Sequence, residues 1–408
     1  MSITRKQENI ITLLTFIILY CSVGYYCKNM LAERVNIFLS FGAILLIFLF
    51  LRKKFFLSKQ MICLFIILMS IGIVSSLMAG DNVVFIIYPI INMFLAILYA
   101  SVVTLELFKK VFVRIVCLVS TISILCGILY YLIPDIFDIF PIIINTAGNG
   151  VRDLFLIVVP DSGYYRVQGF TWEAGVFQFL INIAIAFLIL SNEWTRKKIV
   201  SLIILAIALI LTFSTTGYIV GMINFFLFLS RKCNGTRENL VKTIIKIAMF
   251  VVCLCIIIPI LPTSISGVSF GMAKITRFMQ GVSTAESMDS SSVRFDSIYY
   301  PAKIFIQHPI LGVGYNGLSK LTLSMRHSML TCTIVNYFAM YGIVYGSIIV
   351  AMWMNLAKKL FNNKLIVFLV GLEFILGTIS EQLVNYLIID ILMFMGLTRT
   401  DYILKEQE

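Results

Sequence analysis

Long apolar runs alternate with short polar segments over nearly the whole chain. Each run is close to the 20 or so residues that an α-helix needs to cross the hydrocarbon core of a bilayer. Apolar residues make up 60% of the sequence and charged residues 13%, whereas soluble domains carry roughly 25% charged residues. A soluble core could not remove this much apolar surface from water. The pattern therefore predicts an all-α polytopic membrane protein.

We expect about twelve transmembrane helices in a single integral membrane domain, residues 1–408. The first run follows Arg5 and Lys6 but lacks a cleavage site, so it is expected to be an uncleaved helix. Two later runs are short for full spans and would have to tilt or thin the bilayer. The predicted spans are 9–27, 35–51, 61–78, 83–104, 111–133, 174–191, 199–213, 217–230, 244–262, 329–356, 365–380 and 383–398.

Lys and Arg are concentrated in every second loop. With the N-terminus in the cytoplasm, 22 of the 32 Lys and Arg residues fall in cytoplasmic segments, as the positive-inside rule requires. The alternation predicts an even number of spans with both termini cytoplasmic. Eight of the other ten lie in two long periplasmic segments, 134–173 and 263–328. Long segments are exempt from the rule and are usually functional, so we expect the site there.

The net charge and the cysteine residues argue against two other classes of protein, nucleic-acid-binding proteins and proteins held by disulfides or zinc. The net charge of +12 is explained by the cytoplasmic loops, and no basic run is interleaved with aromatic residues, so no nucleic acid partner is expected. The nine Cys residues form no C-x-x-C pair and lie far from the two His residues. This spacing predicts neither a disulfide framework nor a zinc site.

The first periplasmic segment ends on a cluster of functional residue types. Arg166, Trp172 and Glu173 lie within eight residues, just before a span. Arginine matches phosphate oxygens bidentately, so a cation, an aromatic ring and a carboxylate here suit a sugar-phosphate ligand. The alternative is structural: an aromatic belt at the membrane surface with an Arg–Glu ion pair.

The second periplasmic segment contains a glycine pattern and both histidines. The stretch 312–317 matches G-x-G-x-x-G, but it follows a His-Pro pair and not a strand, so dinucleotide binding is not expected. Such a turn can instead bring backbone N–H groups to an anion. His308 and His327 suit general-base catalysis by their ordinary pKa of about 6.5, although a single His is more often structural.

Three carboxylates stand within apolar runs and are functional candidates by their position. Glu381 is expected at the outer turn between the last two spans, on the side of the Arg cluster. Glu373 and Asp390 could instead pair with buried polar groups. Two G-x-x-x-G pairs predict close helix packing, and these are Gly217 with Gly221 and Gly342 with Gly346.

Four short motifs follow one another along the chain. They are Arg166-x-x-Gly169-Phe-Thr-x-Glu173, Leu211-Thr-x-Ser214-Thr-Thr-Gly217, Arg294 with His308-Pro-Ile-Leu-Gly-Val-Gly314, and His327-Ser328 with Tyr341-Gly342. In this order they resemble motifs of the O-antigen polymerase and O-antigen ligase family. Together they cover about residues 166–345, more than a third of the chain, and the chain departs from the pattern at Thr215, where relatives often carry a basic residue.

The resemblance implies a metal-independent membrane glycosyltransferase without a cofactor, with a fold like the GT-C class, in the bacterial inner membrane. Its partners would be the lipid bilayer, an undecaprenyl-diphosphate-linked oligosaccharide and a membrane protein that regulates chain length. A polymerase would transfer the growing glycan to another lipid-linked repeat unit, whereas a ligase would use lipid A core as acceptor. We prefer the polymerase because Phe- and Ile-rich chains of this length are typical of that branch.

The resemblance and the chemistry together assign expected roles. A diphosphate leaving group needs charge stabilisation more than a proton, which arginines supply. The acceptor hydroxyl needs a base, for which we expect His327, with Glu173 as the alternative. The diphosphate-binding candidates are Arg166, Arg277 and Arg294. The candidates for positioning the sugar and the loops are Trp172, His308, Gly312, Gly314 and Glu381.

Two other functions remain as alternatives. A flippase or secondary transporter often contains internal repeats and broken helices near the membrane midplane, and the sequence has no detectable repeat. A non-catalytic membrane scaffold would tolerate loss of Arg166 or Arg294.

Overall fold

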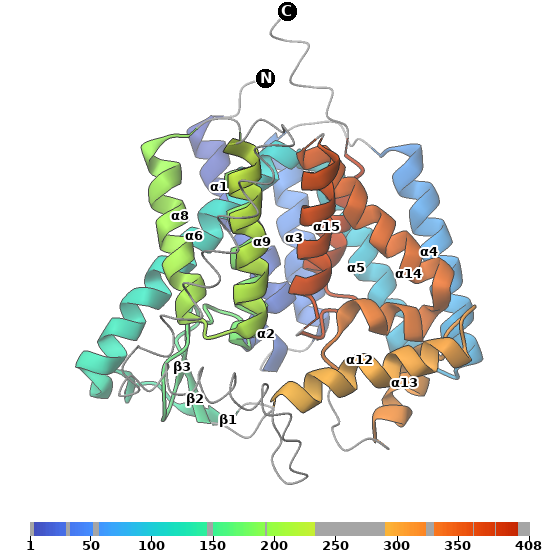
Figure 1. Cartoon of the computed structure of the whole chain (residues 1–408). Helices are drawn as coiled ribbons and strands as arrows, with labels where there is room; N and C mark the ends of the chain where they lie inside the picture. Colours follow the sequence, from blue (N-terminus) through green and yellow to red (C-terminus); the bar gives the residue numbers. More distant parts are fainter. Residues whose placement is uncertain are drawn as a thin grey trace, which may run out of the picture.

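The computed structural model describes most of the chain as a helical bundle with a small sheet at one end (Figure 1). The predicted span 244–262 and the candidates Arg277 and His327 lie outside the described residues. The described residues are 4–29, 33–51, 57–144, 150–191, 194–232, 290–323, 330–361, 363–379 and 381–398.

The first half of the bundle consists of helices that run up and down between its two ends. Several begin at a side chain that accepts a hydrogen bond from the backbone of the first turn, such as Ser58 before α4 and Thr104 before α6. The helices are α1 (Arg5–Val23), α2 (Tyr25–Asn29), α3 (Glu33–Leu51), α4 (Lys59–Met78), α5 (Val83–Val102) and α6 (Leu105–Leu132).

The second half completes the bundle and adds two helices across one end (Figure 1). Those two, α12 (Ser290–Gln307) and α13 (Gly314–Leu323), lie at the end opposite the start of α1. The other helices are α7 (Ala174–Ile189), α8 (Arg196–Leu211), α9 (Thr215–Lys232), α14 (Thr333–Leu360), α15 (Lys364–Gly377) and α16 (Leu387–Met395).

Every predicted span within the described residues corresponds to a helix, which confirms a mostly helical membrane protein. Five helical stretches are long and apolar enough to cross a membrane, and α7 and most of α9 form shorter apolar helices. The count of twelve spans and the orientation in the membrane remain predictions. The five stretches are Arg34–Leu51, Lys59–Met78, Val83–Val102, Leu105–Leu132 and Thr333–Leu360.

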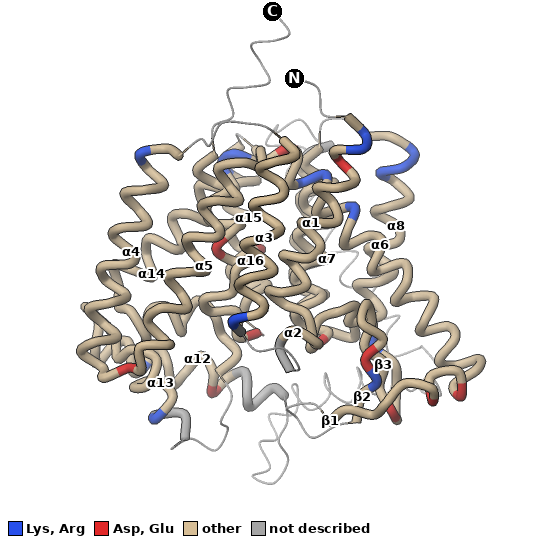
Figure 2. The backbone as a smooth tube through the Cα atoms, turned by 180° about the vertical axis from the view of Figure 1, so that it is seen from behind, with Lys and Arg blue, Asp and Glu red and all other residues tan. Residues whose placement is uncertain are grey.

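Basic residues gather at the end of the bundle where α1, α8 and α15 begin (Figure 2). Up-and-down connectivity brings these helix ends together: Lys110 of α6 forms an ion pair of 2.6 Å with Glu8 of α1. We call this the basic end, and the opposite end, which carries the sheet and α12, the outer end. The separation matches the alternation of charge predicted from the sequence.

A three-stranded antiparallel sheet at the outer end departs from the all-α prediction. Its order is β1 (Ile142–Ile144), β2 (Gly150–Asp153) and β3 (Val158–Pro160). Arg152 on β2 holds it by ion pairs of 2.9 Å to Asp138 and 2.8 Å to Asp161. Arg152 is one of the basic residues that the positive-inside rule does not account for, and these ion pairs give it a structural role.

The segment after β3 is attached to the break between α1 and α2. Gly24 has extended backbone and forms a β-bridge with Thr171. The Tyr25 N–H donates to the Phe170 carbonyl at 2.7 Å, and the Val158 N–H donates to the Gly169 carbonyl at 3.0 Å. The residues just before α7 are thereby fixed to both the sheet and the bundle.

A buried polar chain crosses the bundle between α7, α9 and α15. Asn182 donates to Gln178 Oε1 at 3.0 Å, Asn224 donates to Asn182 Oδ1 at 3.1 Å, and Asn224 also donates to Glu373 Oε1 at 2.9 Å. The alternative that Glu373 pairs with buried polar groups is therefore confirmed. Asp390 is also fully buried, but neither of its carboxylate oxygens has a hydrogen-bond partner among the described residues.

Only one of the two glycine pairs packs helices as predicted. A Cβ on Gly217 would lie 3.0 Å from Gln178 Cβ, so α9 packs closely on α7 there. Gly342 has φ +81° and breaks α14. The Ile343 N–H beyond the break donates to the Pro309 carbonyl at 2.8 Å, because the broken helix meets a turn and not another helix. The prediction that Gly342 packs helices is therefore wrong.

Candidate functional site

Arg166 is fixed to the turn between α8 and α9 at the outer end. Its Nε donates to the Thr212 carbonyl at 2.9 Å, and the adjacent Val167 N–H donates to the Leu211 carbonyl at 2.9 Å. Two of the four family-like motifs, far apart in the sequence, are thereby in direct contact. The guanidinium is half-buried and no carboxylate among the described residues forms an ion pair with it.

The Thr212 and Ser214 side chains hold the α8–α9 turn by local hydrogen bonds. The Ser214 N–H donates to Thr212 Oγ1 at 3.3 Å, and the Gly217 N–H donates to Ser214 Oγ at 3.3 Å. Phe213 between them takes φ +49°, a strained value for a side chain of this size. The motif ends one helix, starts the next and directs the Thr212 carbonyl to Arg166.

Tyr164 lies close to the Arg166 charge. Burial raises the pKa of the Tyr164 phenol, and the Arg166 charge partly opposes that rise. The Tyr164 ring also contacts Phe213 edge-on at 6.3 Å. The Arg166 guanidinium, which has no carboxylate partner among the described residues, produces a local positive potential that suits an anion.

Gly169 lets this segment turn sharply into α7. It has φ +56°, and a Cβ here would lie 2.7 Å from the Phe177 ring and 2.8 Å from Val119. No side chain fits at this position. The Thr171 hydroxyl lies 2.8 Å from both the Gln168 and Glu173 carbonyls, shares its one proton between them and closes the turn.

Trp172 and Glu173 follow at the start of α7. The Trp172 ring contacts the Tyr386 ring at 5.2 Å, so an aromatic pair joins this segment to the residues before α16. Glu173 is exposed at the N-cap position and its side chain makes no capping hydrogen bond. No ion pair joins Arg166 to Glu173 in the described structure, so the Arg–Glu pair of the structural alternative is absent there, while its aromatic belt stays an alternative.

Glu381 lies where it was expected, in the outer turn between α15 and α16. It is buried, and its carboxylate lies against Gly175 in the first turn of α7, two residues after Glu173. The Thr333 hydroxyl donates to the Glu381 carbonyl at 2.6 Å and accepts from the Leu383 N–H at 2.8 Å. Arg166, Trp172 and Glu173 lie on the segment that leads into α7, and Glu381 packs against the start of that helix. We call these four residues the Arg166 group.

His308, Gly312 and Gly314 form a second group against the break in α14. Gly312 has φ +68°, and a Cβ there would collide with the Met340 backbone. The Val313 N–H donates to the Ala339 carbonyl at 3.0 Å. His308 is exposed at the end of α12. The glycines are therefore required for two backbones to approach each other.

The anion at this glycine turn is a side chain of the protein itself. The N–H groups of Tyr315 and Asn316, at the start of α13, donate to the Asp81 carboxylate at 2.9 and 2.7 Å. Gly314 lets Asp81 come close, because a Cβ there would lie 2.8 Å from Asp81 Oδ2. The turn does present N–H groups to an anion, but Asp81 already occupies them.

The two groups lie on different sides of the bundle. Figure 1 shows α13 and the end of α12 on one side of the outer end and β1–β3 with α8 on the other, and the reverse view in Figure 2 agrees. Arg294 is in the first turns of α12, and its side chain lies outside the described structure. His308 is 14 residues further on, roughly 20 Å along a helix. The backbone positions of Arg294 and His308 are therefore at opposite ends of α12.

The sequence reasoning did not find the polar residues inside the outer ends of α3 and α5. Asn36 and Ser40 are four residues apart, as are Tyr88 and Asn92, and all four line one pocket. The spacing was a readable signal, because residues four apart share a helix face. No group of three or more His, Cys, Asp or Glu in the described residues could hold a metal ion. The expected metal independence stays a prediction.

The fold defines a helical membrane protein, and at its outer end Arg166 lies near the Tyr164 side chain. Residues 200–330 match the family model described as O-antigen ligase. The match includes the α8–α9 turn and the His308–Gly314 turn, and it confirms the resemblance to the O-antigen polymerase and ligase family there. It indicates a membrane enzyme that transfers glycosyl groups, and it gives no support to the flippase alternative. None of the curated proteins is significantly similar to the chain.

Proposed function

We propose that the protein polymerises undecaprenyl-diphosphate-linked repeat units by glycosyl transfer at its outer end. The observation that supports this most directly is Arg166, which is fixed by the family-like turn at Thr212 and has no carboxylate partner among the described residues. An arginine with this support can bind a diphosphate without first breaking an ion pair.

The reaction forms one bond and breaks another at the anomeric carbon. The acceptor hydroxyl oxygen attacks this carbon, the bond from it to the diphosphate oxygen breaks, and the diphosphate leaves with the electron pair. Arg166, with Arg277 and Arg294, stabilises the charge that develops on the leaving group. The hydroxyl proton passes to a base, His327 or Glu173. Glu173 is exposed, and its neighbour in the sequence, Trp172, is an aromatic residue of the kind on which sugars stack.

The ligase reaction uses the same donor and the same leaving group, so the acceptor separates the two functions. Purified protein would be incubated with synthetic lipid-linked repeat units, either alone or with lipid A core, and with or without a chelator. We expect a ladder of products from repeat units alone, unchanged by the chelator. Glycan transfer only to lipid A core would establish the ligase, and no transfer to either acceptor would reject the proposal.

A further inference from the structure

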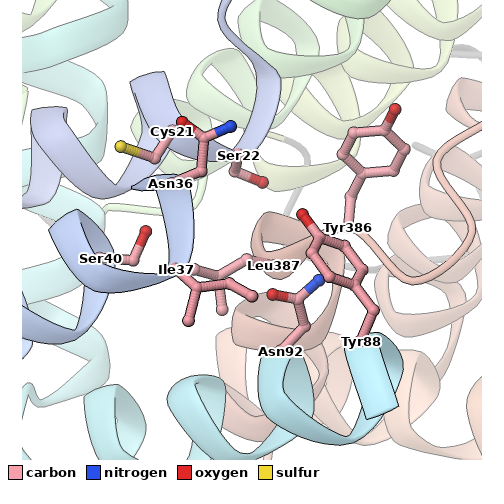
Figure 3. Close-up of a pocket in the computed structure, with 9 residues that line it drawn as sticks. All are labelled: Cys21, Ser22, Asn36, Ile37, Ser40, Tyr88, Asn92, Tyr386 and Leu387. Atoms are coloured by element: carbon pink, nitrogen blue, oxygen red, sulfur yellow. The ribbon is translucent and has the colours of Figure 1, made fainter. Parts of the chain in front are cut away.

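A small polar pocket lies at the outer end, and none of its described lining residues is an arginine. It is formed where α1, α3 and α5 meet the residues that start α16 (Figure 3). The Asn36, Ser40 and Asn92 side chains surround it together with two tyrosine rings. The nine lining residues are Cys21, Ser22, Asn36, Ile37, Ser40, Tyr88, Asn92, Tyr386 and Leu387.

The lining contains amides, hydroxyls and phenols but no charged side chain. A diphosphate therefore has no counter-charge here, and an apolar lipid tail would leave the Asn36 Oδ1 without a hydrogen bond. The volume of about 20 Å³ admits one hydroxyl or hydroxymethyl group, since a single water needs a similar space. The chemistry and size suit one polar substituent of a larger neutral ligand.

Asn36 gives a second, independent indication. Its Nδ2 donates to the Cys27 carbonyl at 2.9 Å, which fixes the orientation of the amide. Its Oδ1 is buried and has no hydrogen-bond partner among the described residues. An oriented acceptor in a buried polar pocket is suited to accept a bond from a ligand hydroxyl, because a buried acceptor without a partner destabilises the protein.

Tyr386 connects the pocket to the Arg166 group. Tyr386 is one of the residues that line the pocket, and its ring contacts the Trp172 ring. Aromatic faces beside hydroxyl and amide groups are suited to bind a pyranose ring, whose C–H groups pack on the ring while its hydroxyls hydrogen-bond. A sugar with one substituent in the pocket would lie next to the segment that carries Arg166 and Glu173.

We infer that this pocket, which we call the Asn36 pocket, binds a neutral sugar residue of the glycan by one hydroxyl or hydroxymethyl group. The inference rests on the proposed function and adds a sugar subsite distinct from the diphosphate site. Specificity for the repeat unit then depends on α3 and α5, outside the four family-like motifs.

Two substitutions at Ser40 test this. Ser40→Leu fills the pocket, and Ser40→Ala removes one hydroxyl without adding volume. Ser70→Leu, at an exposed position of α4, is the matched control. The probe is the mixture of oligosaccharides released by mild acid from the surface polysaccharide of the same cells. Binding to purified full-length protein is measured by equilibrium dialysis, and sugar-free undecaprenyl diphosphate is measured in parallel.

We expect wild type and Ser70→Leu to bind the oligosaccharides equally, Ser40→Ala about fivefold more weakly and Ser40→Leu at least about tenfold more weakly. Undecaprenyl diphosphate should bind all four proteins alike. Equal oligosaccharide binding by Ser40→Leu and wild type would overturn the inference. So would a loss in Ser40→Leu that extends to the diphosphate while Ser40→Ala binds normally. If oligosaccharides bind as expected but lipid-linked units are not extended, the subsite stands and the proposed function fails.

Discussion

At the scale of single residues, Arg166 and Arg152, the two arginines of the first outer segment, differ in the groups that they contact. Arg152 is neutralised by two aspartates and supports the sheet, whereas Arg166 donates to a carbonyl and keeps its charge available. Both were among the basic residues that topology left unexplained. Arg152 has carboxylate partners, and Arg166 has none among the described residues. This difference, and not the position in the sequence, separates the structural arginine from the candidate for substrate binding.

Replacing Arg166 by Lys keeps the charge but removes the planar group that can bond Thr212 and a phosphate together. We expect polymer formation by purified protein to fall by about 10²–10³-fold, with little change in melting temperature. Arg114→Lys is the control, because this side chain is half-exposed at the basic end. Near-normal activity of Arg166→Lys would show that a point charge suffices and that the fork geometry has no role.

At the scale of secondary-structure elements, α14 is two helices joined at Gly342. At the break the Pro309 carbonyl accepts from the Ile343 N–H, and the Ile310 carbonyl lies against Gly342. The Ser75 hydroxyl of α4 shares its one proton between the Leu311 and Met340 carbonyls, at 2.6 and 2.7 Å. Three distant stretches therefore meet on backbone groups, which satisfy one another where water is scarce. This junction fixes the loop that carries His308.

Gly342→Ala tests the junction. Its φ of +81° disfavours any Cβ, and the added methyl would collide with the Ile310 carbonyl. We expect the free energy of unfolding to fall by more than about 2 kcal/mol, read as a lower melting temperature in detergent. Gly42→Ala in α3 is the matched control, because nothing lies within 4 Å of its Cβ position. Equal melting temperatures for the two variants would contradict this account of the break.

At the scale of the whole molecule, the two ends of the bundle differ in charge and in architecture. Lys and Arg gather at the basic end, while the sheet, α12 and the Arg166 group are at the outer end (Figure 2). Charge that cannot cross the membrane determines the orientation of such a bundle. The proposed glycosyl transfer requires that the outer end face away from the cytoplasm.

Labelling of single cysteines tests this orientation. Asp135→Cys at the outer end and Lys197→Cys at the basic end both replace exposed side chains. In intact spheroplasts, a membrane-impermeant thiol reagent should label Asp135→Cys and should label Lys197→Cys only after the membrane is opened. The unsubstituted protein measures labelling of its native cysteines. The reverse pattern would place the Arg166 group in the cytoplasm and reject the proposed reaction.

The sequence alone predicted the helices, the sorting of charge and the segment that carries Arg166. The physical reason is that each of these depends on local composition. A run of apolar residues must form a helix in lipid, because its backbone groups have no other partners there, and loop charge determines orientation without any knowledge of packing. Even Glu381 was correctly assigned to its outer turn, since that turn follows directly from the order of the spans.

Only the tertiary structure decided which polar groups meet. Arg166 and Thr212 are 46 residues apart, and Asp81 and Tyr315 are 234 apart. Such contacts depend on how helices pack, and a sequence without that packing contains no local sign of them. For this reason the sequence predicts a glycine turn that can bind an external anion, whereas in the structure Asp81 accepts hydrogen bonds from its N–H groups. The Asn36 pocket likewise appears only where three helices bring their separate polar faces together.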